Sequence, residues 1–125
     1  MNETEKIMET INAYLTAIKS GAEEDFRRAF YWNAVVITAN GDNPEESAVP
    51  IQAFMEKIQT RNKEGQGGEE IAHGISISHV GGAANVRLDY ELVFPGMQVW
   101  GTDFFNMVKT RDQWKITQKI YAVTH

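Results

Sequence analysis

Asp103, an acidic residue on an otherwise apolar segment, is the position in this sequence best suited to chemistry. It lies between Trp100 and Phe105 in the run Gln98–Val108, which carries large apolar side chains on both of its alternating faces. A carboxyl group on a strand buried on both sides must pair with a cation, accept several hydrogen bonds or keep its proton through a raised pKa. Asp103 is therefore a candidate general acid or base. The alternative is a structural hydrogen bond to a neighbouring strand or helix.

Lys119 and Tyr121 are candidate ligand contacts near the end of the chain. Residues two apart on a strand point the same way, so an ammonium and a phenol would share one wall of a pocket. Together with Asp103 they could bind the polar end of a ligand. The alternative for Lys119 is that its stem crosses apolar surface and its ammonium reaches water.

Aromatic side chains are numerous enough to line an apolar cavity, and also enough to fill a core. The ones predicted to contact a ligand are Tyr14, Trp32, Phe54, Tyr90, Trp100 and Phe105. Helical or strand spacing favours the core for most aromatic residues. Buried Tyr and Trp need partners for their polar tips, which makes Tyr14, Trp32 and Trp100 the preferred pocket residues.

No metal or cofactor is predicted. The chain has no cysteine, which excludes disulfides, thiolate metal sites and cysteine nucleophiles. His73 and His79 are roughly 20 Å apart on a predicted strand, too far to share one metal ion. The glycines at 65, 67 and 68 lack the preceding strand and the lysine of a phosphate loop.

Size and charge limit the partners. The 125 residues fit one domain spanning the whole chain, and 12 Lys and Arg against 17 Asp and Glu give a net charge of -5. This charge disfavours nucleic acid and anionic membranes as partners. The polar start, Met1 to Lys6, resembles neither a signal peptide nor a membrane span, so we expect a cytoplasmic protein.

Three helices are expected in the first half of the chain. Apolar residues at helical spacing predict a long helix over Glu3–Ser20 that stops at Gly21. A second helix is predicted over Ala22–Ala29, and its Phe26 faces the core. A β-branched run predicts a strand over Ala34–Ala39. A third helix begins at Pro50, and a polar loop follows it.

Four strands joined as a meander are expected in the second half. They are predicted over Ile71–His79, Val86–Leu92, Gln98–Val108 and Trp114–Val123. In the first of these, the residues predicted to share one face are Ile71, His73, Ile75, Ile77 and His79. The third strand is apolar on both faces, so its inward face stays open, and a one-residue bulge would exchange Asp103 for Thr102.

The last two predicted strands resemble those of a known family. They read Gly101-Thr102-Asp103-Phe104-Phe105-Asn106-Met107-Val108-Lys109 and Gln113-Trp114-Lys115-Ile116-Thr117-Gln118-Lys119-Ile120-Tyr121. With the order of elements, they resemble the nuclear transport factor two-like, or cystatin-like, superfamily, and within it the family called putative lumazine-binding.

The resemblance implies an α+β fold: a strongly curved mixed or antiparallel sheet wrapped around three N-terminal helices, cone-shaped and with a cavity. It also implies a homodimer joined through the sheet face that carries Trp100, Phe104 and Val108. Superfamily members include ketosteroid isomerases, scytalone dehydratase, polyketide cyclase-like enzymes and binding or association domains.

Three functions therefore stay open. The first is a homodimeric domain that binds a compact small molecule through Asp103, Lys119 and Tyr121. The second is an isomerase, dehydratase or cyclase in which Asp103 is the acid or base, without a cofactor. The third is an association module whose useful surface is the sheet face.

Overall fold

The computed structural model describes residues 1–43 and 47–125 and contains three helices and six strands. The helices are α1 (Glu3–Ser20), α2 (Glu23–Ala29) and α3 (Ile51–Lys63). The strands are β1 (Phe30–Thr38), β2 (Ala48–Pro50), β3 (Glu69–Val80), β4 (Ala83–Phe94), β5 (Met97–Thr110) and β6 (Gln113–Val123). The chain therefore has the predicted α+β class.

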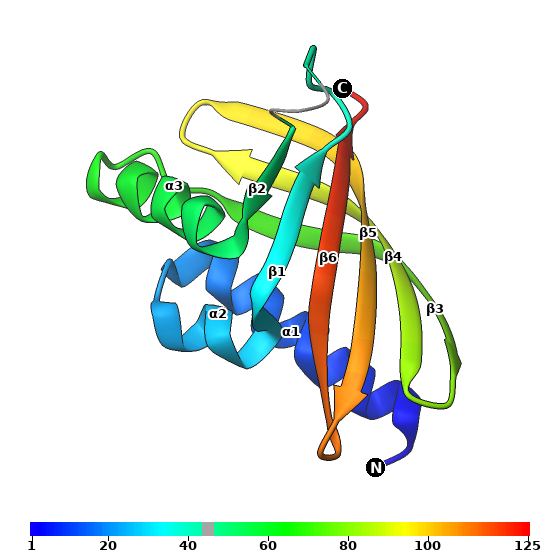
Figure 1. The fold of residues 1–125 in the computed structure, drawn as a ribbon. Helices are drawn as coiled ribbons and strands as arrows, with labels where there is room; N and C mark the ends of the chain where they lie inside the picture. Colours follow the sequence, from blue (N-terminus) through cyan, green and yellow to red (C-terminus); the bar gives the residue numbers. More distant parts are fainter. Residues whose placement is uncertain (44–46) are drawn as a thin grey trace.

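The strands form one mixed sheet in the order β2-β1-β6-β5-β4-β3. The last four strands are an antiparallel meander, as predicted, and β1 joins its β6 edge in parallel. The sheet curves strongly without closing, and the helices lie on its concave side, so the molecule has the expected cone shape (Figure 1).

Helix α1 follows from local signals in its sequence. The Asn2 side chain accepts a hydrogen bond from the backbone N–H of Glu5 and caps the first turn. Gly21 ends the helix in the left-handed conformation, with φ of 71°, which glycine adopts without steric cost. One stripe of the helix is buried between these ends and includes Ile7, Ile11 and Tyr14.

The core fills the space between the helices and the concave face of the sheet. Strand β4 alternates as predicted, with Val86, Leu88 and Tyr90 buried. On β5, Phe105 and Met107 point into the same core, whereas Phe104 is 40% exposed on the convex face. The open question about β5 is thereby answered, because Asp103 shares the buried face with Phe105.

The prediction that five alternating residues of β3 share one face of the sheet is wrong. A bulge interrupts the pairing of β3 with β4 between Ala72 and Gly74. Each added residue reverses the alternation, so Ile75 and Ile77 pair with inward residues of β4 while Ile71 pairs with Glu91 on the convex face. The expected row of five residues on one face is therefore split at the bulge.

Several boundaries also differ from the predictions, and the strands of the meander extend one to three residues beyond the predicted ranges at most ends. Strand β1 begins at Phe30, directly after α2, rather than at Ala34. Pro50 is the N-cap of α3 and not its first helical residue. The three-residue strand β2, which ends at Pro50, was not predicted, because so short a strand shows no apolar alternation. In the described part of the chain, no helix is long and apolar enough to cross a membrane.

Candidate functional site

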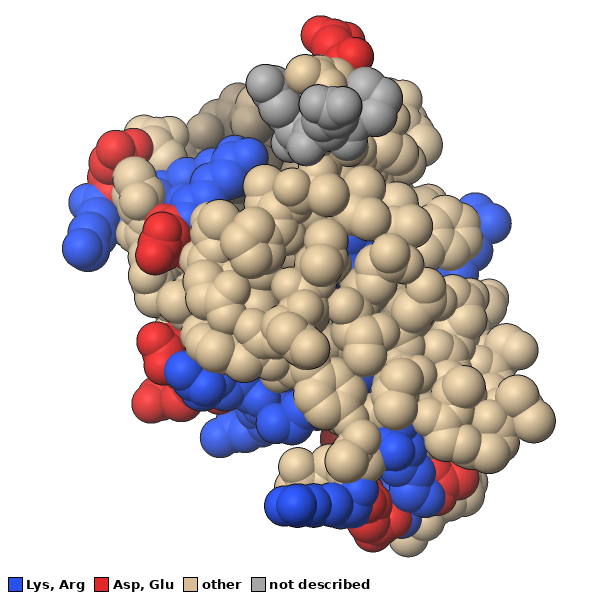
Figure 2. Space-filling model, in the orientation of Figure 1, with Lys and Arg blue, Asp and Glu red and all other residues tan. Residues whose placement is uncertain are grey.

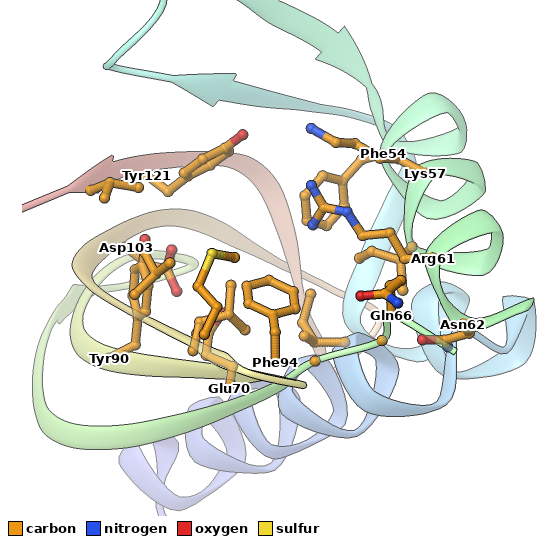
Figure 3. Close-up of a pocket in the computed structure, with 18 of the residues that line it drawn as sticks. Phe54, Lys57, Arg61, Asn62, Gln66, Glu70, Tyr90, Phe94, Asp103 and Tyr121 are labelled. Atoms are coloured by element: carbon orange, nitrogen blue, oxygen red, sulfur yellow. The ribbon is translucent and has the colours of Figure 1, made fainter. Parts of the chain in front are cut away.

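A cavity of about 480 Å³ lies between α3 and the curved sheet (Figure 3). Strands β4, β5 and β6 supply one wall, and α3 with the loop after it supplies the other. The wall is mainly apolar, with residues such as Ile18, Leu92 and Val99. Charged and phenolic side chains are confined to particular parts of it.

The floor of the cavity is a buried polar cluster. Asp103 is fully buried, and Glu70 and Lys119 are 6% and 4% exposed. The Tyr14 hydroxyl joins them: it donates a hydrogen bond to Glu70 Oε1 at 2.6 Å and accepts one from Lys119 Nζ at 2.6 Å. The same hydroxyl lies 3.4 Å from Asp103 Oδ2. We call these four residues the floor cluster.

Two carboxyl oxygens of the floor cluster have no hydrogen-bond partner among the described residues. They are Glu70 Oε2 and Asp103 Oδ1. Lys119 Nζ lies 3.7 Å from Asp103 Oδ1, which is close enough for an ion pair but too long for a hydrogen bond. A buried acceptor without a partner is costly, and a proton shared between the Asp103 and Glu70 carboxyls reduces that cost.

The charge balance of the cluster favours one extra proton. Burial raises the pKa of Asp103 well above its ordinary value, and the Lys119 ammonium offsets part of this rise. The negative charge of Glu70 and hydrogen bonding with it raise the pKa of Asp103 further. Asp103 is therefore held toward its neutral acid form, beside one ammonium and one other carboxyl.

The phenols at the floor stay protonated. Burial, followed by the nearby Asp103 and Glu70 carboxyls, raises the pKa values of both Tyr14 and Tyr90. Tyr90 lines the cavity, and its ring lies over Gly101, where an added Cβ would come within 2.4 Å of the phenol oxygen. The glycine thus makes room for this aromatic ring in the cavity wall.

The Lys119 ammonium is surrounded by aromatic rings. It lies 4.6 Å from the ring centroid of Phe54, 4.8 Å from that of Tyr14 and 5.0 Å from that of Tyr121. Cation–π attraction and the hydrogen bond to Tyr14 together compensate for the loss of water around this charge. The side chain therefore points inward and does not reach solvent.

Two bulges aim the charged members of the floor cluster. The β3 bulge at His73 turns Glu70 onto the buried face, where it pairs across the sheet with Leu92. A second irregularity, between Asn106 and Met107 on β5, lies opposite Thr117 of β6. Ile116 and Lys119 consequently both point inward although they are three residues apart.

Five of the nine residues predicted from the sequence line the cavity. They are Phe54, Tyr90, Asp103, Lys119 and Tyr121. Asp103 and Tyr121 are direct partners on β5 and β6, which explains why they meet.

The other four predicted residues do not line the cavity wall. Tyr14 is fully buried and reaches the site only through its hydroxyl, and Phe105 packs in the core against it, with ring centroids 4.8 Å apart. Trp100 is on the convex face and stacks on His73. Trp32 packs under Arg27, whose guanidinium lies 4.0 Å from the ring centroid.

Sequence reasoning missed Glu70, Lys57 and Arg61, which all line the cavity. Strict alternation along β3 places Glu70 on the convex face, because the bulge is not visible in a simple period of two. Gly74 within a strand was the available signal, since glycine there often marks a bulge. Lys57 and Arg61 stand one helical turn apart on α3, a spacing that identifies their shared face.

Thr102, the neighbour of Asp103 on β5, lies on the convex face of the sheet. Thr102 points away from the cavity and donates a hydrogen bond of 2.8 Å to Asp89 Oδ1. Among residues 1–43 and 47–125, no three His, Asp or Glu side chains are placed to hold a metal ion.

The fold and cavity define a class of protein. The structure is similar to an NTF2-like protein of unknown function from Shewanella baltica, with 25% identity, a TM-score of 0.73, and coverage of 98% of this chain and 94% of that one. It is also similar to an NTF2-like protein from Cytophaga hutchinsonii, with 12% identity and a TM-score of 0.81 over 99% of this chain and all of that one. The chain has the NTF2-like, cystatin-like fold.

The family is narrower than the fold. The family model described as putative lumazine-binding matches residues 2–122, and the chain belongs to this family. A putative scytalone dehydratase from Novosphingobium aromaticivorans shares the fold at 20% identity and a TM-score of 0.80, covering 98% of this chain and 85% of that one. The search of curated proteins found no match.

Proposed function

We propose that this protein binds a compact small molecule with an apolar body in the cavity. The observation that carries the proposal is the cavity itself, whose apolar wall ends at the floor cluster with its two acids, Glu70 and Asp103. A ligand donor that reached one of these carboxyls would form a hydrogen bond shielded from water. Lys119 and Tyr121 would orient the same end of the ligand.

The dimensions of the cavity support this proposal. Its volume of about 480 Å³ lies within the range of roughly 300–1,000 Å³ that is usual for small-molecule sites. The wall above the floor is apolar, as expected for a site that takes a ring and fixes it with a few polar groups. The family description, putative lumazine-binding, favours a ring-shaped ligand.

Backbone NMR with a library of small aromatic compounds tests ligand binding. We expect bound compounds to shift the amide resonances of Gly68, Asp103 and Tyr121, which surround the cavity. A Val99→Trp variant places a large side chain in the cavity wall and should abolish these shifts. Val80→Trp, at a position 80% exposed on β3, is the matched control and should keep them. Shifts that survive in Val99→Trp would place binding elsewhere.

A second candidate function is proton-transfer catalysis at Asp103. The favouring observation is a carboxyl with a raised pKa and a free oxygen, facing a cavity beside two phenols. As a base, Asp103 would act in its ionised form, whose share grows as the pH rises through the raised pKa, and it would take the proton from the carbon next to a carbonyl. Tyr90, whose hydroxyl has no hydrogen bond among the described residues, would donate one to the forming enolate oxygen.

Deuterium exchange tests this catalytic candidate without a known substrate. An enzyme of this type should speed the exchange of the acidic C–H protons of a bicyclic aromatic ketone in heavy water, as followed by NMR. Asp103→Asn should remove the acceleration, since an amide cannot take up the proton, and Asp89→Asn on the convex face should keep it. Exchange at the uncatalysed rate with the wild-type protein would rule out this mechanism for that ketone.

We also propose that the protein forms a homodimer through the convex face of β5. Phe104 and Val108 are 40% and 41% exposed on this face, with Asn106 between them along the strand. The third function considered, an association module, would use this same surface. A cytoplasmic location and the lack of nucleic-acid or membrane partners stay predictions.

A further inference from the structure

Helix α3 presents an unusual face to the cavity. The residues that line the cavity from this helix follow the helical period and are Phe54, Lys57, Ile58, Arg61 and Asn62. The stripe of this helix that packs against the core is apolar and consists of Ile51, Met55 and Ile58. Lys57 and Arg61 lie beside that stripe and bring two cations to the cavity.

Neither cation has an acidic partner in the described part of the chain. Most other basic residues in the described part of the chain form ion pairs, such as Lys109 with Glu3 at 2.9 Å and Arg27 with Glu23 at 2.8 Å. The exceptions, Lys63, Arg111 and Lys115, do not line the cavity. No carboxylate oxygen of the described residues lies within 4.0 Å of Lys57 or Arg61. Arg61 instead lies over the ring of Phe94, 5.5 Å from its centroid, in the cavity wall.

The two cations lie at the opposite end of the cavity from the floor cluster. In Figure 3, Asp103 and Tyr90 are at one end, and Lys57 and Arg61 extend from α3 at the other, with Phe94 between the two ends. Lys57 is exposed and Arg61 is half-buried, so this end is the mouth. The cavity thus has an acidic floor, an apolar middle and a basic mouth.

The charge at the mouth is opposite to that of the whole protein. The chain has a net charge of -5, yet Lys57 and Arg61 bring two positive charges to the mouth; over α3 as a whole, basic and acidic side chains are mixed (Figure 2). A local positive field at the entrance of an apolar cavity attracts anions and concentrates them at the opening. Arg and Lys are also the side chains that form charge-assisted hydrogen bonds with carboxylate, sulfonate or phosphate groups.

We infer that the ligand is an organic anion, with an apolar ring body in the middle of the cavity. Its anionic group lies between Lys57 and Arg61 at the mouth, and a hydrogen-bond donor points to Asp103 and Glu70 at the floor. This inference rests on the proposed binding function and adds the chemical class of the ligand.

Two dyes that differ by one charged group provide the test. The dyes are 6-anilinonaphthalene-2-sulfonate, whose N–H and sulfonate lie at opposite ends of the naphthalene, and N-phenyl-2-naphthylamine. They share the same aromatic rings and the same N–H donor, but only the first carries a negative charge. Both fluoresce when they enter an apolar site, so their dissociation constants can be measured by titration. We expect the sulfonate to bind about tenfold more tightly, as for two partly exposed ion pairs.

Variants test whether the two cations at the mouth cause the tighter binding of the sulfonate. Lys57→Gln combined with Arg61→Gln should weaken sulfonate binding about tenfold and leave the neutral dye unchanged. Lys63→Gln removes an exposed cation of the same helix that does not line the cavity, and it should change neither dye. Added salt should weaken binding of the sulfonate only. The circular dichroism of each variant checks that it is folded.

The possible outcomes distinguish failure of the anionic ligand class from failure of the proposed binding function. Equal binding of the two dyes, blocked by Val99→Trp, would overturn the anionic class and leave the cavity as a binding site. A sulfonate preference that persists in the double variant would also overturn it. If neither dye binds, or if Val99→Trp binds both as well as the wild type does, both the inference and the proposed function fail for ligands of this size.

Discussion

At the scale of single residues, the floor cluster couples folding to protonation. Glu70, Asp103 and Lys119 are at least 94% buried, so their charges cannot be relaxed by water. Two acids and one cation leave one negative charge in excess, and the pKa of Asp103 rises because of burial and of Glu70. The native protein therefore binds a proton that the unfolded chain releases at lower pH.

Asp103→Asn should change how stability depends on pH. Because the native pKa is raised above the ordinary value of 3.8, this carboxyl contributes stability that is complete at lower pH and is lost as the pH rises through the native pKa. The asparagine variant does not titrate, so its free energy of unfolding should gain on the wild type as the pH rises, by at most about 1.4 kcal/mol per pH unit. Urea denaturation at a series of pH values measures this.

The exposed acid Asp42 provides the comparison for this experiment. An Asp42→Asn variant should follow the wild-type profile, because its side chain is not part of a buried cluster. If the Asp103→Asn profile runs parallel to the wild-type profile, then Asp103 is ionised in the native protein over the whole range. The description of the cluster as proton-binding would then be wrong.

Lys119→Met should destabilise the protein by about 3 kcal/mol, as expected when a buried charge loses its partner. The methionine fills the same space, but Glu70 and the Tyr14 hydroxyl lose the nearby ammonium. Chemical denaturation measures the loss. Lys115→Met, at a half-buried position of the same strand, should change stability by no more than about 0.5 kcal/mol.

Removing the excess negative charge should restore part of this loss. In the Lys119→Met background, Glu70→Gln leaves a neutral hydrogen-bonding side chain next to Tyr14 and should recover stability. A single Lys119→Met variant as stable as the wild type would show that the ammonium does not hold the cluster together.

At the scale of elements, the bulges of the sheet decide which side chains reach the cavity. Without the irregularity at His73, Glu70 would face the solvent, and without the one at Thr117, Lys119 would do so. Bulges are common beside functional sites because they redirect a side chain at little cost to the rest of the strand. Glu70 and Lys119 of the floor cluster therefore depend on these bulges.

Strand β5 also shapes the cavity wall through Gly101, on which the Tyr90 ring packs closely. A Cβ at position 101 would lie 2.3 Å from the carbonyl oxygen of Ala122 and 2.4 Å from the Tyr90 hydroxyl oxygen. Gly101→Ala should therefore cost about 2 kcal/mol of stability and displace the Tyr90 ring. Thermal denaturation and near-ultraviolet circular dichroism report the two effects.

Gly82→Ala is the matched control for this substitution. Its added Cβ would meet the Lys109 carbonyl oxygen at 3.6 Å, an ordinary contact, and Gly82 is not among the glycines with positive φ. We expect its stability to stay within about 0.5 kcal/mol of the wild type. Equal stability of the two variants would mean that the sheet relaxes around position 101.

At the scale of the whole molecule, the helices cover only the concave side of the sheet (Figure 1). The convex side of β5 keeps Phe104 and Val108 more than a third exposed, and Trp100 is half-buried next to them. A second copy placed on this face would remove these side chains from water. This arrangement is the basis of the proposed homodimer.

Sedimentation equilibrium should give a mass of twice the 14.1 kDa of one chain. Phe104→Glu combined with Val108→Glu should yield the single-chain mass, because two carboxylates on each copy would face those of the other across the contact. Val80→Glu, which adds the same charge at an exposed apolar position of β3, should leave the mass unchanged. A wild-type protein of single-chain mass would contradict the homodimer.

The sequence by itself determined the elements with strong local signals. The apolar spacing and caps of α1 gave its bounds, and the alternation of β4 identified its buried face. The last two strands also carried the resemblance to the family that the model match established. Such signals depend on neighbours along the chain, so they can be seen without the fold. Asp103, Lys119 and Tyr121 were selected in the same way.

Only the tertiary structure decided which faces meet and where space remains. Strand β5 is apolar on both sides, so its own residues do not show that Asp103 points inward. Alternation gives only which residues share a face, and one extra residue within a strand reverses it, as His73 does for Glu70 on β3. The cavity forms where the curved sheet and α3 stay apart, and Trp100 lies outside it because its strand presents that face to the convex side. These outcomes depend on pairing between distant segments, which no local pattern contains.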